Sequence, residues 1–315
     1  MNSRCEKSGR LSLGLLAAMA APLAHTASRE SWLTVLAAGF AVLGVSLLRN
    51  NTEDAERSGK VCAVLRWIWI TIVLSQTAHW VMTCWKDYES YEAIPLTLLA
   101  LGAWAAAKGD QVIKRVGGVL FWGLLILLAA IGVSAVKDVK IVNLRPVWTV
   151  PDGTFLTVLL IPCIILSQSG KDNNRGEGIA LWAYAIGVSV VTTGVLSLEV
   201  ARQVQSPVYE LGRSVSVLGF AERIESLVAA AMTLGYFVLT GCLLGRAGEA
   251  AGNVEKKWHK PGVWISAATA GGLLIWGIRI NGIVLAGGIV LLWVCWPLCG
   301  KTADKINLKK SEKSP

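Results

Sequence analysis

Long runs of apolar residues follow one another along most of this chain, and they limit what it can fold into. The runs cover residues 11–27, 31–48, 62–84, 93–107, 116–136, 154–169, 178–198, 225–245, 262–278 and 281–299. A helix needs roughly 20 apolar residues to cross a bilayer. Charged residues make up 16% of the 315 residues, against about 25% in soluble domains. We therefore expect an all-α integral membrane protein of about ten transmembrane helices, forming one polytopic domain over residues 1–300.

The distribution of basic residues predicts the orientation of these helices. If the N-terminus is cytoplasmic, most of the 30 Lys and Arg residues fall in cytoplasmic segments, as the positive-inside rule requires. Both termini are then cytoplasmic, and the Lys-rich tail 301–315 is expected to be disordered. The net charge of +9 is explained by this orientation and does not indicate nucleic-acid binding.

One alternative concerns the start of the chain. Arg4, Lys7 and Arg10 precede the first apolar run, which ends in small residues near Ala27. This pattern is also typical of a cleaved signal peptide. Cleavage would leave nine helices and place the termini on opposite sides of the membrane.

Motifs for catalysis or metal binding are absent from the sequence. The seven Cys include no C-x-x-C pair, and the three His are scattered, so we expect no metal site and no cofactor. No hydrolase, metalloprotease, phosphate-loop or dinucleotide motif is present. An enzyme is therefore not expected.

Two prolines mark the expected ligand site. Pro22 lies inside the first run and Pro162 inside the sixth, five helices apart as an inverted repeat of five plus five helices requires. Proline removes one backbone donor and frees a carbonyl one turn earlier. Each helix is then either broken there, which leaves backbone groups for a ligand, or only kinked, which is the common effect of proline in a membrane helix. The candidate ligand-binding residues are Ala20, Ala21, Pro22, Gln76, Pro162 and Cys163.

Polar residues within the third run are a second feature. Gln76 and His79 are three residues apart, which places them on one helix face. They line a ligand site or hydrogen-bond to a neighbouring helix, and the second is the commoner use.

The stretch 199–224 is the longest segment without a predicted span. After Pro207, apolar residues recur at steps of three and four, at Val208, Leu211, Val215 and Leu218. This spacing predicts a short amphipathic connector helix at about 206–222 on the extracytoplasmic face. It acts as a lid or as a packed connector.

The segment 206–227 resembles a motif of the endospore germination permeases, the multi-span B-subunits of nutrient germinant receptors in spore-forming bacteria. The matching positions are Pro207, Arg213, Phe220, Arg223, Glu225 and Leu227. Shorter stretches in the same order are also similar to that family: Arg29 to Trp32, Gly109 to Arg115, and Asn143 to Val147.

The resemblance implies a fold, a ligand and partners that the apolar runs alone do not indicate. That family belongs to the amino acid–polyamine–organocation superfamily, whose fold is a 5+5 inverted repeat with broken first and sixth helices. It implies a small nutrient germinant, often an amino acid, and two partners, a receptor A-subunit and a C-subunit lipoprotein. It also implies a location in the spore inner membrane or cell membrane, in contact with lipid.

Our interpretation is a permease-like receptor subunit that binds a nutrient and signals to its partners. Arg223 and Glu225 are expected to brace the connector onto the eighth helix. The alternatives are a secondary amino acid transporter and a non-transporting scaffold subunit. The chain departs from the family in its shorter length and in a first helix that has Ala17 to Pro22 where a Gly-x-Gly break is usual.

Overall fold

The computed structural model describes residues 2–50, 60–84, 93–145, 147–165, 175–204, 206–214 and 225–296. These residues form helices and connectors, with no β-strand among them. The helices are α1 (Asn2–Ala27), α2 (Trp32–Asn50), α3 (Lys60–Cys84), α4 (Ala93–Lys108), α5 (Asp110–Val136), α6 (Gly153–Ile165), α7 (Arg175–Leu196), α8 (Leu198–Gln203), α9 (Pro207–Ser214), α10 (Glu225–Val254), α11 (His259–Ile275) and α12 (Gly282–Val290). Short helices η2 (Ile141–Leu144), η4 (Lys256–Trp258) and η5 (Leu291–Cys295) complete the described chain.

Each predicted apolar run corresponds to one of the longer helices. Three helices extend well beyond their runs, and the first of them, α1, already begins at Asn2. Helix α5 begins at Asp110, so its first turns include Lys114 and Arg115, and α10 continues to Val254. The extension of α10 carries Arg246 and Glu249, whose side chains lie 2.5 Å apart. Oppositely charged residues three positions apart stabilise a helix. The helix therefore continues beyond the end of the apolar run.

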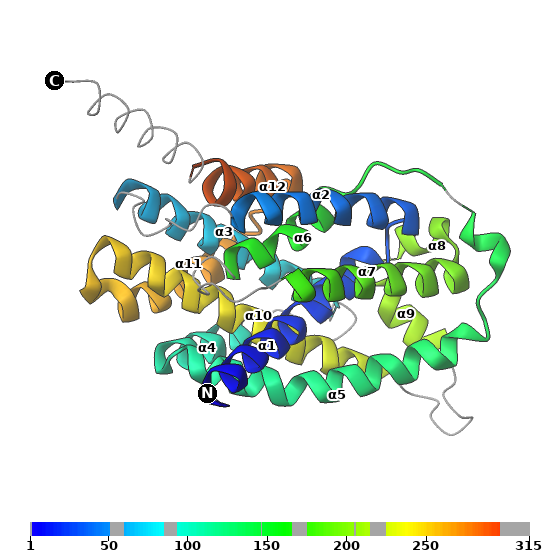
Figure 1. Cartoon of the computed structure of the whole chain (residues 1–315), viewed down its shortest axis with the longest axis horizontal. Helices are drawn as coiled ribbons and strands as arrows, with labels where there is room; N and C mark the ends of the chain where they lie inside the picture. Colours follow the sequence, from blue (N-terminus) through cyan, green and yellow to red (C-terminus); the bar gives the residue numbers. More distant parts are fainter. Residues whose placement is uncertain are drawn as a thin grey trace.

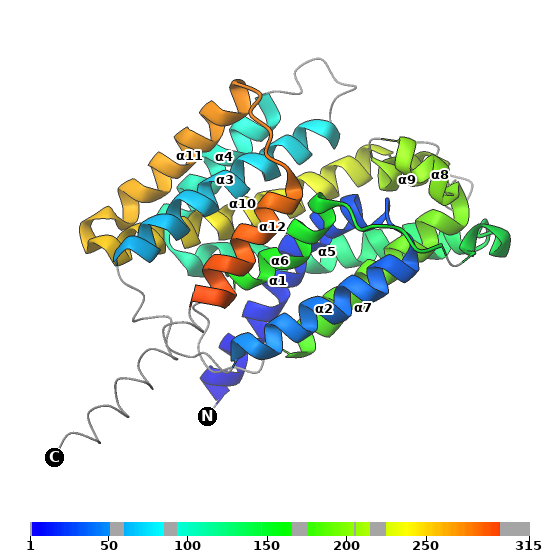
Figure 2. The ribbon, with the colours of Figure 1, turned by 90° about the horizontal axis from the view of Figure 1, so that it is seen from above.

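The helices form two packed groups (Figures 1 and 2). In one, α3, α4, α10 and α11 all contact one another. In the other, α1 contacts α6 and α7, and α2 contacts α6 and α7. Helix α1 also contacts α10, which joins the groups, and the remaining long helices α5 and α12 pack on their flanks.

Many contacts repeat between the two halves of the chain. To compare the halves, we leave out the short helices α8 and α9 and replace each of the other ten helices by the one five places later among those ten. The shift takes α1 to α6, α2 to α7, α3 to α10, α4 to α11 and α5 to α12. The α1–α5 contact then corresponds to α6–α12, α4–α10 corresponds to α3–α11, and α5–α10 corresponds to α3–α12. The α3–α10, α2–α7, α1–α6 and α4–α11 contacts map onto themselves. Four contacts have no counterpart among the stronger pairs: α1–α10, α6–α10, α4–α5 and α5–α7.

Helix α1 lies inside this assembly. Its residues Ala17, Ala18, Met19 and Ala24 have no exposed surface, and it contacts α5, α6, α7 and α10. The segment that is also typical of a signal peptide is thus a packed part of the fold.

The expected break at Pro22 is absent. Helix α1 runs without interruption from Asn2 to Ala27, and α6 runs through Pro162 to Ile165, the last described residue before the gap. One missing donor does not end a helix when the surrounding hydrogen bonds remain. The hydroxyl of Thr26 adds one such bond by donating to the carbonyl of Pro22 at 2.8 Å. The prediction of broken first and sixth helices was therefore wrong for the described residues.

The outward faces of several helices are apolar. Along α5, Val119, Trp122, Ile126 and Val133 are exposed at helical spacing. Exposed apolar side chains also lie on α3, α4, α11, α12 and η5: Val61, Leu65, Ile68, Leu101, Trp104, Trp264, Ile265, Ile283, Val284 and Leu291. A soluble monomer rarely exposes so much contiguous apolar surface. By length and composition, the helices over Lys60–Thr83, Ile179–Leu196 and Val228–Val254 are able to cross a membrane.

Candidate functional site

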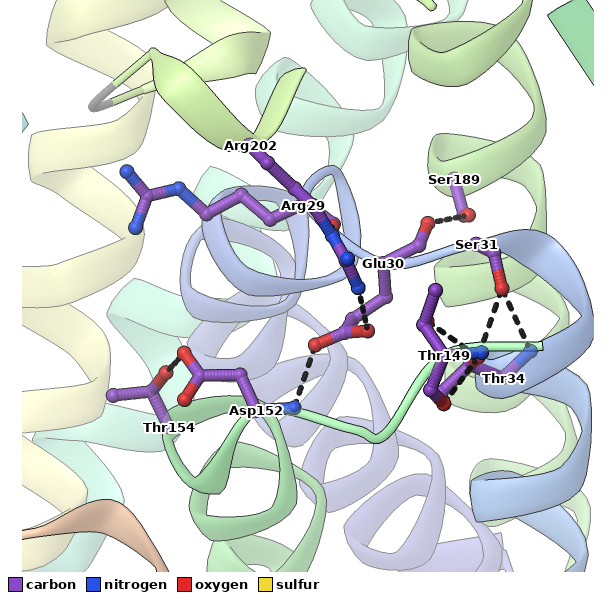
Figure 3. Close-up of polar contacts among 9 residues, drawn as sticks. All are labelled: Arg29, Glu30, Ser31, Thr34, Thr149, Asp152, Thr154, Ser189 and Arg202. Carbon is purple, nitrogen blue, oxygen red and sulfur yellow. Dashed lines mark hydrogen bonds and ion pairs between the residues drawn. The ribbon is translucent and has the colours of Figure 1, made fainter. Parts of the chain in front are cut away.

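Several connectors meet at the end of the bundle where α8 and α9 lie (Figures 2 and 3). They are the α1–α2 turn, the α5–α6 connector and the α7–α8 junction. Their polar side chains form what we call the connector cluster, which consists of Arg29, Glu30, Ser31, Thr34, Thr149, Asp152, Thr154, Ser189 and Arg202. The sequence separates these segments by more than 100 residues in places, so the fold alone brings them together.

Glu30 is the centre of the cluster. It lies in the short turn between α1 and α2, and only 2% of the residue is exposed. Its Oε1 accepts a hydrogen bond from the backbone N–H of Asp152 at 2.7 Å. Its backbone carbonyl accepts one from the hydroxyl of Ser189 on α7 at 2.6 Å. The turn is therefore attached to both α6 and α7.

The second carboxylate oxygen of Glu30 has a different environment. Its Oε2 has no hydrogen-bond partner among the described residues. The nearest cation is the guanidinium of Arg202 on α8, at 3.8 Å, which is an ion pair without a direct hydrogen bond. Figure 3 shows Arg202 reaching toward this oxygen, while the carboxylate of Asp152 turns away toward the hydroxyl of Thr154.

These surroundings change the acidity of Glu30. Burial raises the pKa of its carboxyl group, and the negative charge of Asp152 acts in the same direction. The Asp152 N–H, the charge of Arg202 and the hydroxyl of Thr149 oppose that rise in the pKa without cancelling it. A carboxyl group of this kind can take up and release a proton closer to neutral pH than an exposed glutamate does.

The end of α8 is attached to the same turn through Arg29. The Arg29 guanidinium donates to the carbonyl of Val204 at 2.6 Å, and the Arg202 Nε donates to the carbonyl of Arg29 at 3.4 Å. Together with the Glu30–Arg202 ion pair, these contacts hold α8 across the end of α1 (Figure 3).

The α5–α6 connector is fixed by its own hydrogen bonds. The hydroxyl of Thr34 on α2 bonds to the carbonyl of Thr149 at 3.0 Å, and the indole N–H of Trp32 donates to the carbonyl of Leu144 at 3.1 Å. The side-chain amide of Asn143 donates to the carbonyl of Gly194 on α7 at 3.0 Å. The stretches around Trp32 and Asn143 are thus neighbours in space.

The predicted ligand residues of α1 are in packed surroundings. The carbonyl of Ala20 accepts a hydrogen bond from the hydroxyl of Tyr184 on α7 at 3.1 Å. Ala21 is 1% exposed and lies directly against Gly235 of α10, where an added Cβ would come within 2.7 Å of the Ala21 Cβ. Pro22 is buried as well. The Ala20 carbonyl and the Ala21 side chain therefore have partners within the protein.

The other predicted ligand residues are divided between two places. Pro162 and Cys163 lie on α6, which contacts α1, so the two prolines belong to adjacent helices. Gln76 belongs elsewhere: its Nε2 donates to the carbonyl of Ile278 between α11 and α12 at 3.3 Å. The imidazole Nε2 of His79 lies 3.3 Å from the same oxygen. Gln76 and His79 do share a face, and that face contacts the α11–α12 connector.

The residues of the strongest resemblance are described only in part. Pro207 begins α9, in which Val208 and Leu211 are buried. Arg213 lies in the last turn of α9 and Glu225 begins α10. Phe220 and Arg223 fall outside the described residues, as does the expected bracing of the connector by Arg223.

Sequence reasoning missed the central role of Glu30. The signal was the shortness of the turn: only three residues, 28–30, separate the first two apolar runs. A charge in such a turn has little freedom to reach water, so it is buried if anything packs over it. Among the described residues, no group of three His, Cys, Asp or Glu side chains is placed to hold a metal ion.

A scan against protein-family models found no family that matches this chain, and a search of curated proteins found no match either.

Proposed function

We propose that this chain is a polytopic membrane protein built as a 5+5 inverted repeat, and that it acts as a permease-like receptor subunit for a small nutrient. The observation that carries the proposal is the repetition of helix contacts under a shift of five. Inverted repeats of this kind form transporter folds in which the substrate binds near the middle of the membrane, between the two halves. The exposed apolar faces of α3, α4, α5, α11 and α12 support a lipid environment.

The expected ligand site lies between α1, α3, α6 and α10. Helix α1 contacts both α6 and α10, and α10 contacts α3. The two helices with an internal proline, α1 and α6, correspond to each other under the shift. A ligand that binds one arrangement of these helices better than another shifts the population toward that arrangement. In the germination-receptor reading, this shift is passed to the A-subunit and the C-subunit lipoprotein.

A scaffold subunit is the second candidate, and a specific observation favours it. The Ala20 carbonyl and the Ala21 side chain already have partners in Tyr184 and Gly235. A protein that only holds its partner subunits needs no space beside these residues. The scaffold therefore binds no nutrient, which separates it from the receptor.

Thermal stability of the purified protein in the presence of amino acids, sugars and nucleosides tests the proposal. A ligand present at about 100 times its dissociation constant stabilises the folded state by roughly 2.7 kcal/mol. We expect one class of nutrient to raise the unfolding temperature. Pro22→Ala and Pro162→Ala should reduce the rise, whereas Pro261→Ala, at an exposed position near the start of α11, should not.

Three results would separate the candidates. A rise that is equal in all three variants would place the ligand away from α1 and α6. No rise with any nutrient, with or without partner subunits, would favour the scaffold. Uptake of the stabilising nutrient by proteoliposomes that contain this chain alone would favour a secondary transporter.

A further inference from the structure

The segment α8 is attached to the rest of the protein in an unusual way. Ser197, which joins α7 to α8, has a φ of 67° and a ψ of 155°. It is the only described residue other than glycine with a positive φ. A serine in this region of the backbone is strained, and such strain persists only where surrounding contacts hold it. The contacts beyond this junction therefore hold α8 in place.

Three of those contacts lead to the α1–α2 turn. Arg202 lies 3.8 Å from Glu30 Oε2 and donates to the Arg29 carbonyl, and Arg29 donates to the Val204 carbonyl. Glu30 itself is fixed to α6 and α7 by Asp152 and Ser189. Of these three contacts, the ion pair is the one that depends on the ionisation of a carboxylate.

The oxygen that faces Arg202 is suited to receive a proton. Glu30 Oε2 is buried and has no hydrogen-bond donor among the described residues. Oε1 remains occupied by the Asp152 amide, so protonation at Oε2 leaves that hydrogen bond intact. A proton also requires no cavity. Arg202 has 44% of its side chain exposed, so it can turn into solvent when the negative charge disappears.

Among the described residues, few charged groups lie around Glu30. Arg202 comes from α8, Asp152 from the connector to α6, and Arg29 from the same turn, while His25 lies one turn earlier on α1. Helix α7 contributes the neutral Ser189. Figure 3 shows that Arg29 points away from the Glu30 carboxylate and that Asp152 faces Thr154. Arg202 is accordingly the cation whose position depends on the charge of Glu30.

We propose that Glu30 is a proton-binding site that controls the attachment of α8. With Glu30 ionised, Arg202 is held against it and α8 lies across the end of α1. A proton from the aqueous phase adds to Oε2 and forms an O–H bond, the attraction to Arg202 is lost, and α8 turns about Ser197. The inference concerns this connector alone and holds for a receptor, a transporter or a scaffold.

Hydrogen–deuterium exchange of the purified full chain tests the proposal. The amides of Ala201 and Val204 donate to the carbonyls of Ser197 and Val200 and report on α8. After correction for the pH dependence of chemical exchange, we expect their protection in the wild type to fall about tenfold or more between neutral and acidic pH. In Glu30→Gln the protection should be low at every pH. Glu199→Gln, which changes an exposed carboxylate on the same helix, should behave as the wild type.

A second variant guards against misfolding of Glu30→Gln. Arg202→Gln alters the half-exposed partner and should also give low protection of α8 that no longer depends on pH. Arg202→Lys keeps the charge and should restore part of the pH response. Protection of α8 that is independent of pH in the wild type would overturn the proposal. So would a wild-type pH profile in either Glu30→Gln or Arg202→Gln.

Discussion

Gly153 and Gly282 bring the first turns of α6 and α12 into backbone contact. A Cβ added to Gly153 would overlap the backbone of Gly282 and Ile283, and a Cβ added to Gly282 would overlap that of Gly153 and Thr154. The hydroxyl of Thr157 donates to the Gly282 carbonyl across the same contact at 2.8 Å. Small residues commonly permit such close approach between helices in membranes.

Gly153→Ala is therefore expected to destabilise the protein by about 1–3 kcal/mol, because the backbones must separate to admit a methyl group. Gly287→Ala is the matched control. It lies on α12 with nothing within 4 Å of the added Cβ, so it should leave the unfolding temperature unchanged or slightly raised. Unfolding followed by tryptophan fluorescence in detergent measures both. Equal unfolding temperatures for the two variants would contradict the close contact.

Arg66 fixes the irregular end of the last described helix. Its Nε and one terminal nitrogen both donate to the carbonyl of Leu292, at 3.2 and 3.0 Å. Leu292 belongs to η5, a π-helical turn. The guanidinium also lies 5.7 Å from the ring of Trp293.

We expect Arg66→Met to lower the free energy of unfolding by roughly 1–3 kcal/mol, since it removes a charged donor from a carbonyl. Arg115→Met, at an exposed position on α5, should change it by less than about 0.5 kcal/mol. The same fluorescence measurement compares them. If the two substitutions cost the same, the contact with Leu292 contributes nothing specific.

Tyr184 controls access to the carbonyl of Ala20. Tyr184→Phe removes the hydroxyl that donates to this oxygen and should cost about 1 kcal/mol of stability. If a nutrient binds beside α1, the variant should also change its affinity, because the freed carbonyl becomes available to the ligand. Calorimetric titration with the stabilising nutrient measures this. An unchanged affinity would place the ligand away from Ala20.

The raised pKa of Glu30 predicts a pH dependence of stability. A carboxyl group whose pKa is higher in the folded state binds its proton more tightly there, so folding is favoured at low pH. As pH rises from the ordinary glutamate value to the raised value in the folded protein, this stabilisation is lost. The unfolding temperature of Glu30→Gln, minus that of the wild type, should therefore increase with pH across this window and then level off. If this difference in unfolding temperature falls as pH rises, the pKa of Glu30 is lowered in the folded protein and the prediction is wrong.

The positions of the helices could be predicted from the sequence far better than their interior details. Apolar runs locate the helices because each helix has apolar side chains along its whole length. Helix α4, between Ala93 and Lys108, is an example. The breaks expected at Pro22 and Pro162 did not appear, because the loss of one donor is tolerated within a packed helix. Helix α8 was not predicted, since Ser197 gives no sign of the backbone turn that separates α8 from α7.

The candidate site was less accessible to sequence reasoning. Gln76 and His79 were correctly placed on one face, but their partner, the Ile278 carbonyl, is a backbone group that no pattern reveals. The partners of Glu30 come from the α5–α6 connector, α7 and α8. Only the tertiary fold brings these segments to one turn.

The packing of α3 and α4 against α10 and α11 has a consequence for biogenesis. The ribosome releases α3 and α4 early, yet their principal neighbours are the segments from Glu225 onward. Until those segments are made, the inward face of α3 lacks its native contacts. One of them is the hydrogen bond from the Thr71 hydroxyl to the hydroxyl of Ser266 on α11. The nascent chain therefore depends on the insertion machinery or a chaperone to hold its first helices apart from other proteins until synthesis is nearly complete. A truncation before α10 should accordingly be degraded, whichever ligand the finished protein binds.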